Sequence, residues 1–216
     1  MPLPKNNLLF GFKPKLTDEQ GVFVNSIFDN QLTIVDAKAG TGKTLLAVAC
    51  SKIIGKDLMY IFSPVQEHKI GFLPGSQEEK EYKYTIPLHD ALAEIGEQPL
   101  KVIYSEDNPK KSKEGNVWVY PTSHIFLRGT NIKDDKTVII DEVQNCTVEE
   151  LKKILTRVHN GKVILIGHSG QIDLQNKEQS GFQKCIDHFK NKDYCCVCEL
   201  TQNFRGRLSQ DADELH

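Results

Sequence analysis

The chain has 216 residues, 39% of them hydrophobic, which suffices for the core of one α/β domain with a small insertion. Its 27 Lys and Arg residues nearly balance 29 Asp and Glu residues, so net charge does not indicate nucleic-acid binding, although a local basic groove stays open. No apolar run is long enough for a membrane span, and residues 1–15 lack the apolar core of a signal peptide. We therefore expect a cytoplasmic protein with no membrane partner.

Helices and strands alternate along the sequence. In chain order, the patterns predict a helix over residues 17–29, strand 32–35, helix 44–54, strand 58–62, a helical run ending near 95, strand 117–120, strand 137–140, helix 147–158, strand 162–166, helix 180–189 and strand 195–200. The strands are apolar on both faces, which is typical of a parallel sheet covered by helices on both sides. We therefore predict a single α/β domain over residues 1–216, with a partly irregular insertion around 64–115.

Three cysteines, Cys195, Cys196 and Cys198, crowd the last predicted strand. A metal site would need a second cluster at ligand spacing, and the sequence shows none. Small apolar side chains in a buried strand are the better interpretation.

A phosphate-binding loop is the strongest motif of the sequence. It consists of Ala37, Lys38, Ala39, Gly40, Thr41, Gly42, Lys43 and Thr44. The loop follows a predicted strand and opens a predicted helix, so its backbone N–H groups can point at phosphates. Lys43 is expected to reach the β- and γ-phosphates of ATP, and Thr44 to ligate Mg²⁺. A chance Gly-rich turn would not combine this strand, this spacing, the Lys and the Thr.

An acidic pair ends the predicted strand 137–140. Asp141 is placed to hold Mg²⁺, and Glu142 to orient or deprotonate the attacking water. A helix-capping acid is the structural alternative. The second carboxylate is typical of ATPases, because nucleotide kinases activate no water.

Two glutamines are candidates for nucleotide contacts. Gln171 lies in the loop after the predicted strand 162–166, where an amide can sense the γ-phosphate and align the water. Gln20 precedes the phosphate loop by about 20 residues, and its amide can both donate to and accept from an adenine edge. For both residues the alternative is a solvated position, on a loop for Gln171 and on a helix for Gln20.

Arginines are few, and Arg128, Arg157 and Arg205 fall near the ends of predicted elements that would form the site. An arginine placed on the γ-phosphate raises the hydrolysis rate by about 10³–10⁵-fold. Any one of them alone is more often part of a surface ion pair.

Taken together, these residues resemble the PhoH-like ATPase family, and the resemblance runs in the same order along the chain from Gln20 to Arg205. Phages also carry such short family members. Stretches similar to the family beyond the phosphate loop are residues 71–75, 87–92, 128–129, 141–147, 155–157, 167–174 and 180–182. The resemblance implies a RecA-like fold, similar to the first motor domain of superfamily-one helicases, and ATP hydrolysis. It also assigns adenine recognition to Gln20, γ-phosphate sensing to Gln171 and a phosphate contact to Arg205.

This chain departs from the family pattern at four positions, among them Thr130, where a second basic residue is common, and Val143, where the family has a small Ala. Ala37 replaces the usual first Gly of the loop, and His168 stands where the family has an acid after Gly167. The His168 departure puts the coupling of the γ-phosphate to motion in doubt.

Three functions remain to be compared. The helicase-like motifs favour an ATPase that remodels RNA or single-stranded DNA. A nucleotide-dependent switch or assembly protein with slow hydrolysis is the alternative, and Glu142 and Gln171 argue against a small-molecule kinase. One RecA-like lobe leaves the site open to an arginine from a neighbour, Arg157 or Arg128, so we expect a homo-oligomer in the form of a ring of six.

Overall fold

The computed structural model describes residues 16–63, 77–105, 117–127, 131–133 and 135–212. Six strands form one sheet in this part of the chain: β1 (Leu32–Ala37), β2 (Asp57–Phe62), β3 (Val119–Ser123), β4 (Lys136–Asp141), β5 (Lys162–Gly167) and β6 (Cys195–Leu200). The strand order is β3-β2-β4-β5-β1-β6, and every pairing is parallel. The predicted parallel α/β architecture is therefore confirmed.

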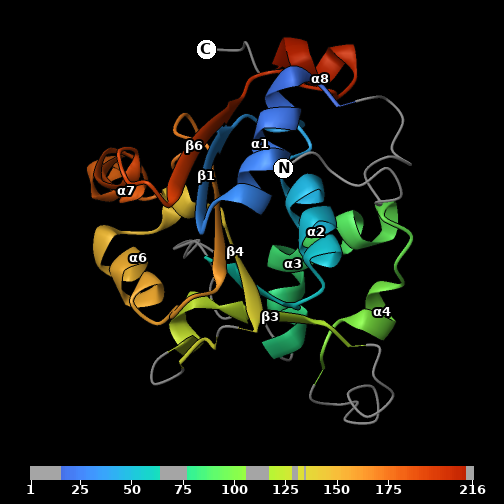
Figure 1. Cartoon of the computed structure of the whole chain (residues 1–216). Helices are drawn as coiled ribbons and strands as arrows, with labels where there is room; N and C mark the ends of the chain where they lie inside the picture. Colours follow the sequence, from blue (N-terminus) through green and yellow to red (C-terminus); the bar gives the residue numbers. More distant parts are fainter. Residues whose placement is uncertain (1–15, 64–76, 106–116, 128–130, 134, 213–216) are drawn as a thin grey trace.

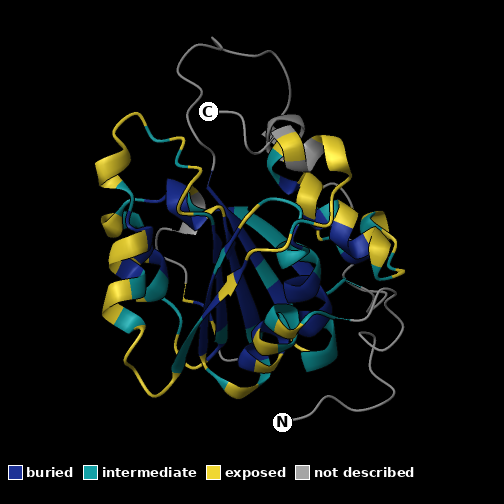
Figure 2. Ribbon diagram, turned by 90° about the horizontal axis from the view of Figure 1, so that it is seen from above, coloured by how far each residue is buried: buried dark blue, intermediate teal, exposed yellow. Residues whose placement is uncertain are grey.

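Helices cover both faces of this sheet (Figure 1). They are α1 (Asp18–Asp29), α2 (Lys43–Ile54), α3 (Gln77–Glu94), α4 (Pro99–Val102), α6 (Val148–Leu155), α7 (Phe182–Phe189) and α8 (Arg207–Ala212), with 3₁₀ turns η2 (His124–Leu127), η3 (Val143–Asn145) and η4 (Lys177–Gln179). Helices α1, α2 and α3 bury Phe23, Leu46 and Leu88 against one face. Helices α6 and α7 bury Leu151 and Phe182 against the other. Figure 2 shows the buried strands between these two layers. No described helix is long and apolar enough to cross a bilayer.

Capping boxes fix the start of two helices. The Thr17 hydroxyl accepts from the Gln20 backbone N–H at 3.2 Å, and the Gln20 side chain accepts from the Thr17 N–H at 3.1 Å. Thr147 and Glu150 form the same reciprocal pair at the start of α6, as the sequence predicts.

Several predicted boundaries are wrong by two or three residues. Helix α6 ends at Leu155 rather than at residue 158, because the N–H groups of Arg157 and Val158 donate to carbonyls three residues back and Val158 pairs with Ile132 as an isolated bridge. Strand β3 starts two residues later than predicted and continues to Ser123, in register with β2. Helix α7 starts at Phe182, not at residue 180.

The strand order gathers the predicted motifs at the carboxyl ends of the strands. Parallel strands present their carboxyl ends together, which is where ligands bind in such sheets. Strand β1 lies between β5 and β6, so the residues after Ala37, Gly167 and Leu200 become neighbours. Strand β4 ends at Asp141, on the other side of β5.

Candidate nucleotide site

The phosphate loop connects the end of β1 to the start of α2. Gly40 and Gly42 both have left-handed backbones, with φ of 75° and 80°, which glycine adopts without steric cost. The Thr41 hydroxyl donates to the Lys38 carbonyl at 3.0 Å and closes the loop on itself. Lys43 is the first residue of α2, and its ammonium donates to the Ala37 carbonyl at 3.2 Å. The structure therefore folds residues 37–44 into the strand–loop–helix arrangement that the sequence predicts.

Asp141 joins the acidic strand to this loop. The residue is 2% exposed, and its Oδ2 accepts from the Thr44 hydroxyl at 3.3 Å. The hydroxyl of Tyr60, on β2, donates to the same oxygen, while Oδ1 accepts from the Glu142 N–H at 2.9 Å. Burial, followed by the charge of Asp141, raises the pKa of Tyr60 well above its ordinary value, so this hydroxyl remains a donor. The carboxylate is thus held in one orientation, facing Thr44.

Glu142 has a left-handed backbone, with φ of 55°, which no other non-glycine residue shows among those described. Such conformations cost energy and cluster at functional sites. Desolvation by the surrounding protein, and then the negative charge of Asp141, raise the pKa of the Glu142 carboxyl, while the positive charge of Lys43 opposes the shift. The side chain is nonetheless exposed, so solvent limits the size of this effect. A carboxylate with a raised pKa, open to water, is suited to act as a general base.

Gln144 holds Glu142 in place and links it to the loop after β5. The Gln144 side chain is buried, its Nε2 donates to Glu142 Oε2 at 2.6 Å, and its Oε1 accepts from the His168 N–H at 3.0 Å. The amide therefore bridges the acidic motif and the loop after β5. Sequence reasoning assigned no role to Gln144 or to Tyr60.

The loop after β5 carries Gln171 and His168. Gln171 is exposed, and its backbone N–H donates to the His168 carbonyl at 3.1 Å. The His168 Nδ1 lies 3.5 Å from Asp36 Oδ1, and the Ser169 N–H donates to that same oxygen at 3.0 Å. Asp36 comes from β1, so a carboxylate still stands beside this loop although His168 replaces the acid of the family pattern.

The segment after β6 packs directly on the phosphate loop. The Phe204 N–H donates to the Gly40 carbonyl at 2.9 Å, and the Arg205 N–H donates to Asn203 Oδ1 at 2.8 Å. A Cβ atom built on Gly40 would lie 2.3 Å from Asn203 Oδ1 and 2.7 Å from Arg205 Cγ. The structure thus brings the predicted Arg205 against the loop, with Asn203 as an additional neighbour that the sequence did not single out.

This contact predicts a selective effect of Gly40→Ala. The variant should lose about 1 kcal/mol to backbone strain and also displace residues 203–205, weakening nucleotide binding about tenfold or more. Gly55→Ala is the matched control, because Gly55 has the same φ of 75° and open space around its Cβ position. Thermal melting and titration with a fluorescent ATP analogue measure both quantities. Equal nucleotide affinities for the two variants would contradict this prediction.

Two other predicted residues lie in different surroundings. Gln20 donates from Nε2 to the Thr41 carbonyl at 3.0 Å, so its amide is tied to the phosphate loop, and its adenine contact stays a prediction. Arg157 follows α6, and its carbonyl accepts from the N–H of Ile132, a residue that precedes β4. Arg157 therefore lies at the amino ends of the strands. Its Nε donates to the Lys153 carbonyl at 3.0 Å. Arg128 lies outside the described residues.

The cysteines of β6 carry free thiols. Cys198 is buried, Cys195 and Cys196 are half-buried, and burial raises the pKa of Cys198 to about 12. Nowhere in the described residues does a group of three or more His, Cys, Asp or Glu side chains form a metal site. The prediction of apolar packing fits this environment.

A profile of the PhoH-like protein family matches residues 13–214. The chain belongs to this family. Its parallel sheet, with a phosphate loop after β1, has the RecA-like fold of P-loop proteins.

Relatives in the PhoH-like family extend beyond this sequence. A PhoH-like protein of Synechocystis is 34% identical over 193 residues, which cover 86% of this chain and 56% of that protein. A PhoH-like protein of Bacillus subtilis is 33% identical over 190 residues, with shares of 85% and 56%. This chain thus spans about half the length of the curated relatives it matches.

One solved structure supports the fold. The UvsW helicase of bacteriophage T4 matches with a TM-score of 0.54 and 13% identity, over 88% of this chain and 61% of that one. At this identity the likeness concerns the arrangement of strands and helices alone.

Proposed function

We propose that this chain hydrolyses ATP with Mg²⁺. The observation that carries the proposal is the 3.3 Å contact between the Thr44 hydroxyl and Asp141 Oδ2, which joins the phosphate loop to the acidic strand. Both are hard oxygen donors, and Mg²⁺ is commonly held by one or two protein oxygens together with substrate phosphates. The donor set therefore fits Mg²⁺, which when bound neutralises phosphate charge and polarises the γ-phosphoryl group.

Each of the remaining side chains has a separate role at the phosphates. Lys43 and the N–H groups of the loop bind the β- and γ-phosphates, because the start of α2 attracts anions. Glu142, oriented by Gln144, takes a proton from the attacking water at its carboxylate. We assign γ-phosphate sensing to Gln171 and stabilisation of the developing charge to Arg205, which packs on Gly40.

We further propose that hydrolysis is coupled to remodelling of RNA or single-stranded DNA. The support is the fold shared with the UvsW helicase, together with the helicase-like order of the motifs. The six free thiols suit the reducing cytoplasm, where we propose that the protein acts.

Assembly into a homo-oligomeric ring, of six copies, is part of this proposal. Arg157 lies at the amino ends of the strands, whereas the phosphate loop follows the carboxyl end of β1. An arginine placed there reaches a nucleotide only in a neighbouring copy. We therefore assign Arg157 to the site of the next subunit.

One experiment tests the coupling and the ring together. ATP turnover is measured with and without single-stranded RNA across a range of protein concentrations, with light scattering on the same samples. We expect turnover per chain to rise with RNA, and also with concentration as rings of six form. Turnover indifferent to RNA would favour the nucleotide-dependent switch instead. A monomer with constant specific activity would exclude the shared site.

A further inference from the structure

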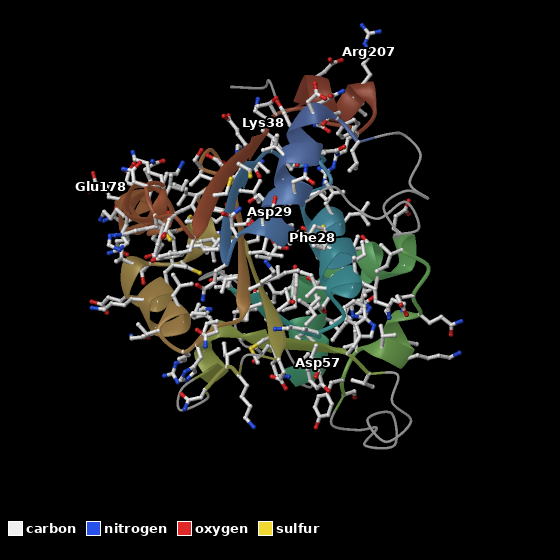
Figure 3. All side chains as sticks on the ribbon, in the orientation of Figure 1. Phe28, Asp29, Lys38, Asp57, Glu178 and Arg207 are labelled. Carbon is white, nitrogen blue, oxygen red and sulfur yellow. The ribbon has the colours of Figure 1, made fainter. Side chains whose placement is uncertain are left out.

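Asp36 is a carboxylate beside the phosphate loop that has no role in the proposed mechanism. It lies on β1 one residue before Ala37 and pairs in register with Gly167 of β5. Lys38, two residues further on, and Asp57, at the start of β2, lie at opposite ends of the molecule in Figure 3. Asp36 therefore belongs to the end of the strands that carries the nucleotide site.

The residues directly after β5 form a β-turn. The Gln171 N–H donates to the His168 carbonyl at 3.1 Å and closes the turn, so the turn sets where the Gln171 side chain begins. The first residue of such turns is commonly Asp, Asn or Ser, because their side-chain oxygen accepts a backbone N–H two residues on. His168 occupies this position and carries no such oxygen. The turn therefore has no side-chain acceptor of its own there.

Asp36 supplies an acceptor from the neighbouring strand. Its Oδ1 accepts from the Ser169 N–H at 3.0 Å and lies 3.5 Å from Nδ1 of His168, a contact without hydrogen-bond geometry. Only 17% of the His168 side chain is exposed, and a Cβ atom built on Gly170 would lie 3.0 Å from its Nε2. The imidazole thus packs between the carboxylate and the turn, and the turn is fixed to β1.

The same turn is tied on its other side to the acidic motif. The His168 N–H donates to Gln144, whose amide also donates to Glu142. Two consecutive backbone N–H groups of the turn therefore bond to side chains from two elements, β1 and η3. Strand β1 continues into the phosphate loop, and η3 follows Glu142 directly. These contacts set the position of Gln171 relative to both halves of the site.

We propose that Asp36 positions Gln171 for hydrolysis, and that β1, rather than the turn itself, supplies the carboxylate that fixes the turn. The inference rests on the proposed ATPase function, because it concerns the residue assigned to γ-phosphate sensing. Asp36 acts through Ser169 and His168, so it is a positioning residue. Its removal should lower kcat and leave KM for ATP nearly unchanged, because the phosphate-binding groups of the loop stay in place.

Two substitutions of Asp36 separate the acceptor from its charge. In Asp36→Ala the Ser169 N–H loses its acceptor, and kcat should fall about 10- to 100-fold, the effect of a misplacement on the order of 1 Å. Asp36→Asn keeps an acceptor oxygen at the same place, so its kcat should stay close to that of the parent. Asp187→Ala is the control, since it removes a carboxylate on α7 that is 54% exposed, and it should leave kcat unchanged.

Moving the carboxylate into the turn gives the sharpest test. In the Asp36→Ala protein, His168→Asp provides the first residue of the turn with its own acceptor, so most of the lost kcat should return. In the wild-type protein the same change places a second carboxylate beside Asp36, and the repulsion between like charges should lower kcat. Opposite effects of one substitution in the two backgrounds are expected only if both positions act on the same turn.

Amide hydrogen exchange at the turn requires no hydrolysis, so it separates this inference from the ATPase proposal. Followed by NMR in the free protein, exchange of the Gln171 N–H should be faster in Asp36→Ala than in the parent, and His168→Asp should slow it again. A wild-type chain without ATP turnover would end the ATPase proposal, whereas this order of exchange rates would still decide whether Asp36 fixes the turn.

Three results would overturn the proposal. The first is an Asp36→Ala protein with the kcat and the Gln171 exchange rate of the parent. The second is a loss of kcat in Asp36→Ala that His168→Asp does not reverse, and the third is an equal loss in Asp36→Ala and Asp36→Asn. Thermal melting checks that each variant is folded. If Asp36→Ala does not fold, an unchanged kcat for His168→Asp in the wild-type background contradicts the proposal.

Discussion

Replacing Lys43 with alanine should weaken ATP binding on the order of 100-fold, as expected for the loss of about two charge-assisted hydrogen bonds. The Lys43 ammonium lies across the phosphate loop on the Ala37 carbonyl, so it stands among the backbone groups that would surround the phosphates. No other side chain of the loop can supply this charge at the start of α2, since Lys38 is exposed at the far end of the loop.

A fluorescent ATP analogue, titrated with Mg²⁺, measures this loss. Lys153→Ala serves as the control, because it removes one exposed lysine without touching the loop. If Lys43→Ala binds the analogue as tightly as the parent, Lys43 does not contact the phosphates, and the nucleotide site must be sought elsewhere.

Glu142→Gln should bind ATP with little change and turn it over about 10²–10⁴ times more slowly, which is the usual contribution of a general base. The new amide oxygen can still accept from Gln144 Nε2, so the shape of the site is kept and only the proton acceptor is lost. Asp141→Asn should act differently, by weakening the dependence on Mg²⁺, since its carboxylate faces Thr44.

Steady-state phosphate release, together with the binding titration, separates these effects. Glu149→Gln is a suitable control, because this carboxylate lies on α6 with 87% of its side chain exposed. Wild-type turnover in Glu142→Gln would mean that the water is activated by another group.

The sequence was sufficient to predict the parts of the site whose signal is local. The loop after β1 needs only glycines, a lysine and a threonine at fixed spacing, and Asp141 needs only a buried strand before it. The proximity of the phosphate loop and Asp141 followed from the parallel sheet, because the carboxyl ends of parallel strands lie together. The contact between Thr44 and Asp141 was therefore predictable although 97 residues separate them.

The contacts that orient these residues could not be predicted in the same way. Tyr60 meets Asp141 because β2 pairs with β4, and a single sequence does not reveal strand order. Gln144 has an amide that satisfies two loops at once, which spacing along one motif cannot show. Asn203 contacts Gly40 only in the folded chain, and its position in the sequence does not indicate this contact. Helix α8 was not predicted, because its six residues show no apolar periodicity.

The rate of phosphate release from ATP by the purified wild-type chain, as a function of Mg²⁺, tests the central claim most directly. We predict hydrolysis that requires Mg²⁺, stops when a chelator is added and returns when Mg²⁺ is restored in excess, because Thr44 and Asp141 offer the ion its protein oxygens. Absence of hydrolysis over the whole Mg²⁺ range, with and without RNA, or hydrolysis at full rate in the chelator, would contradict the account.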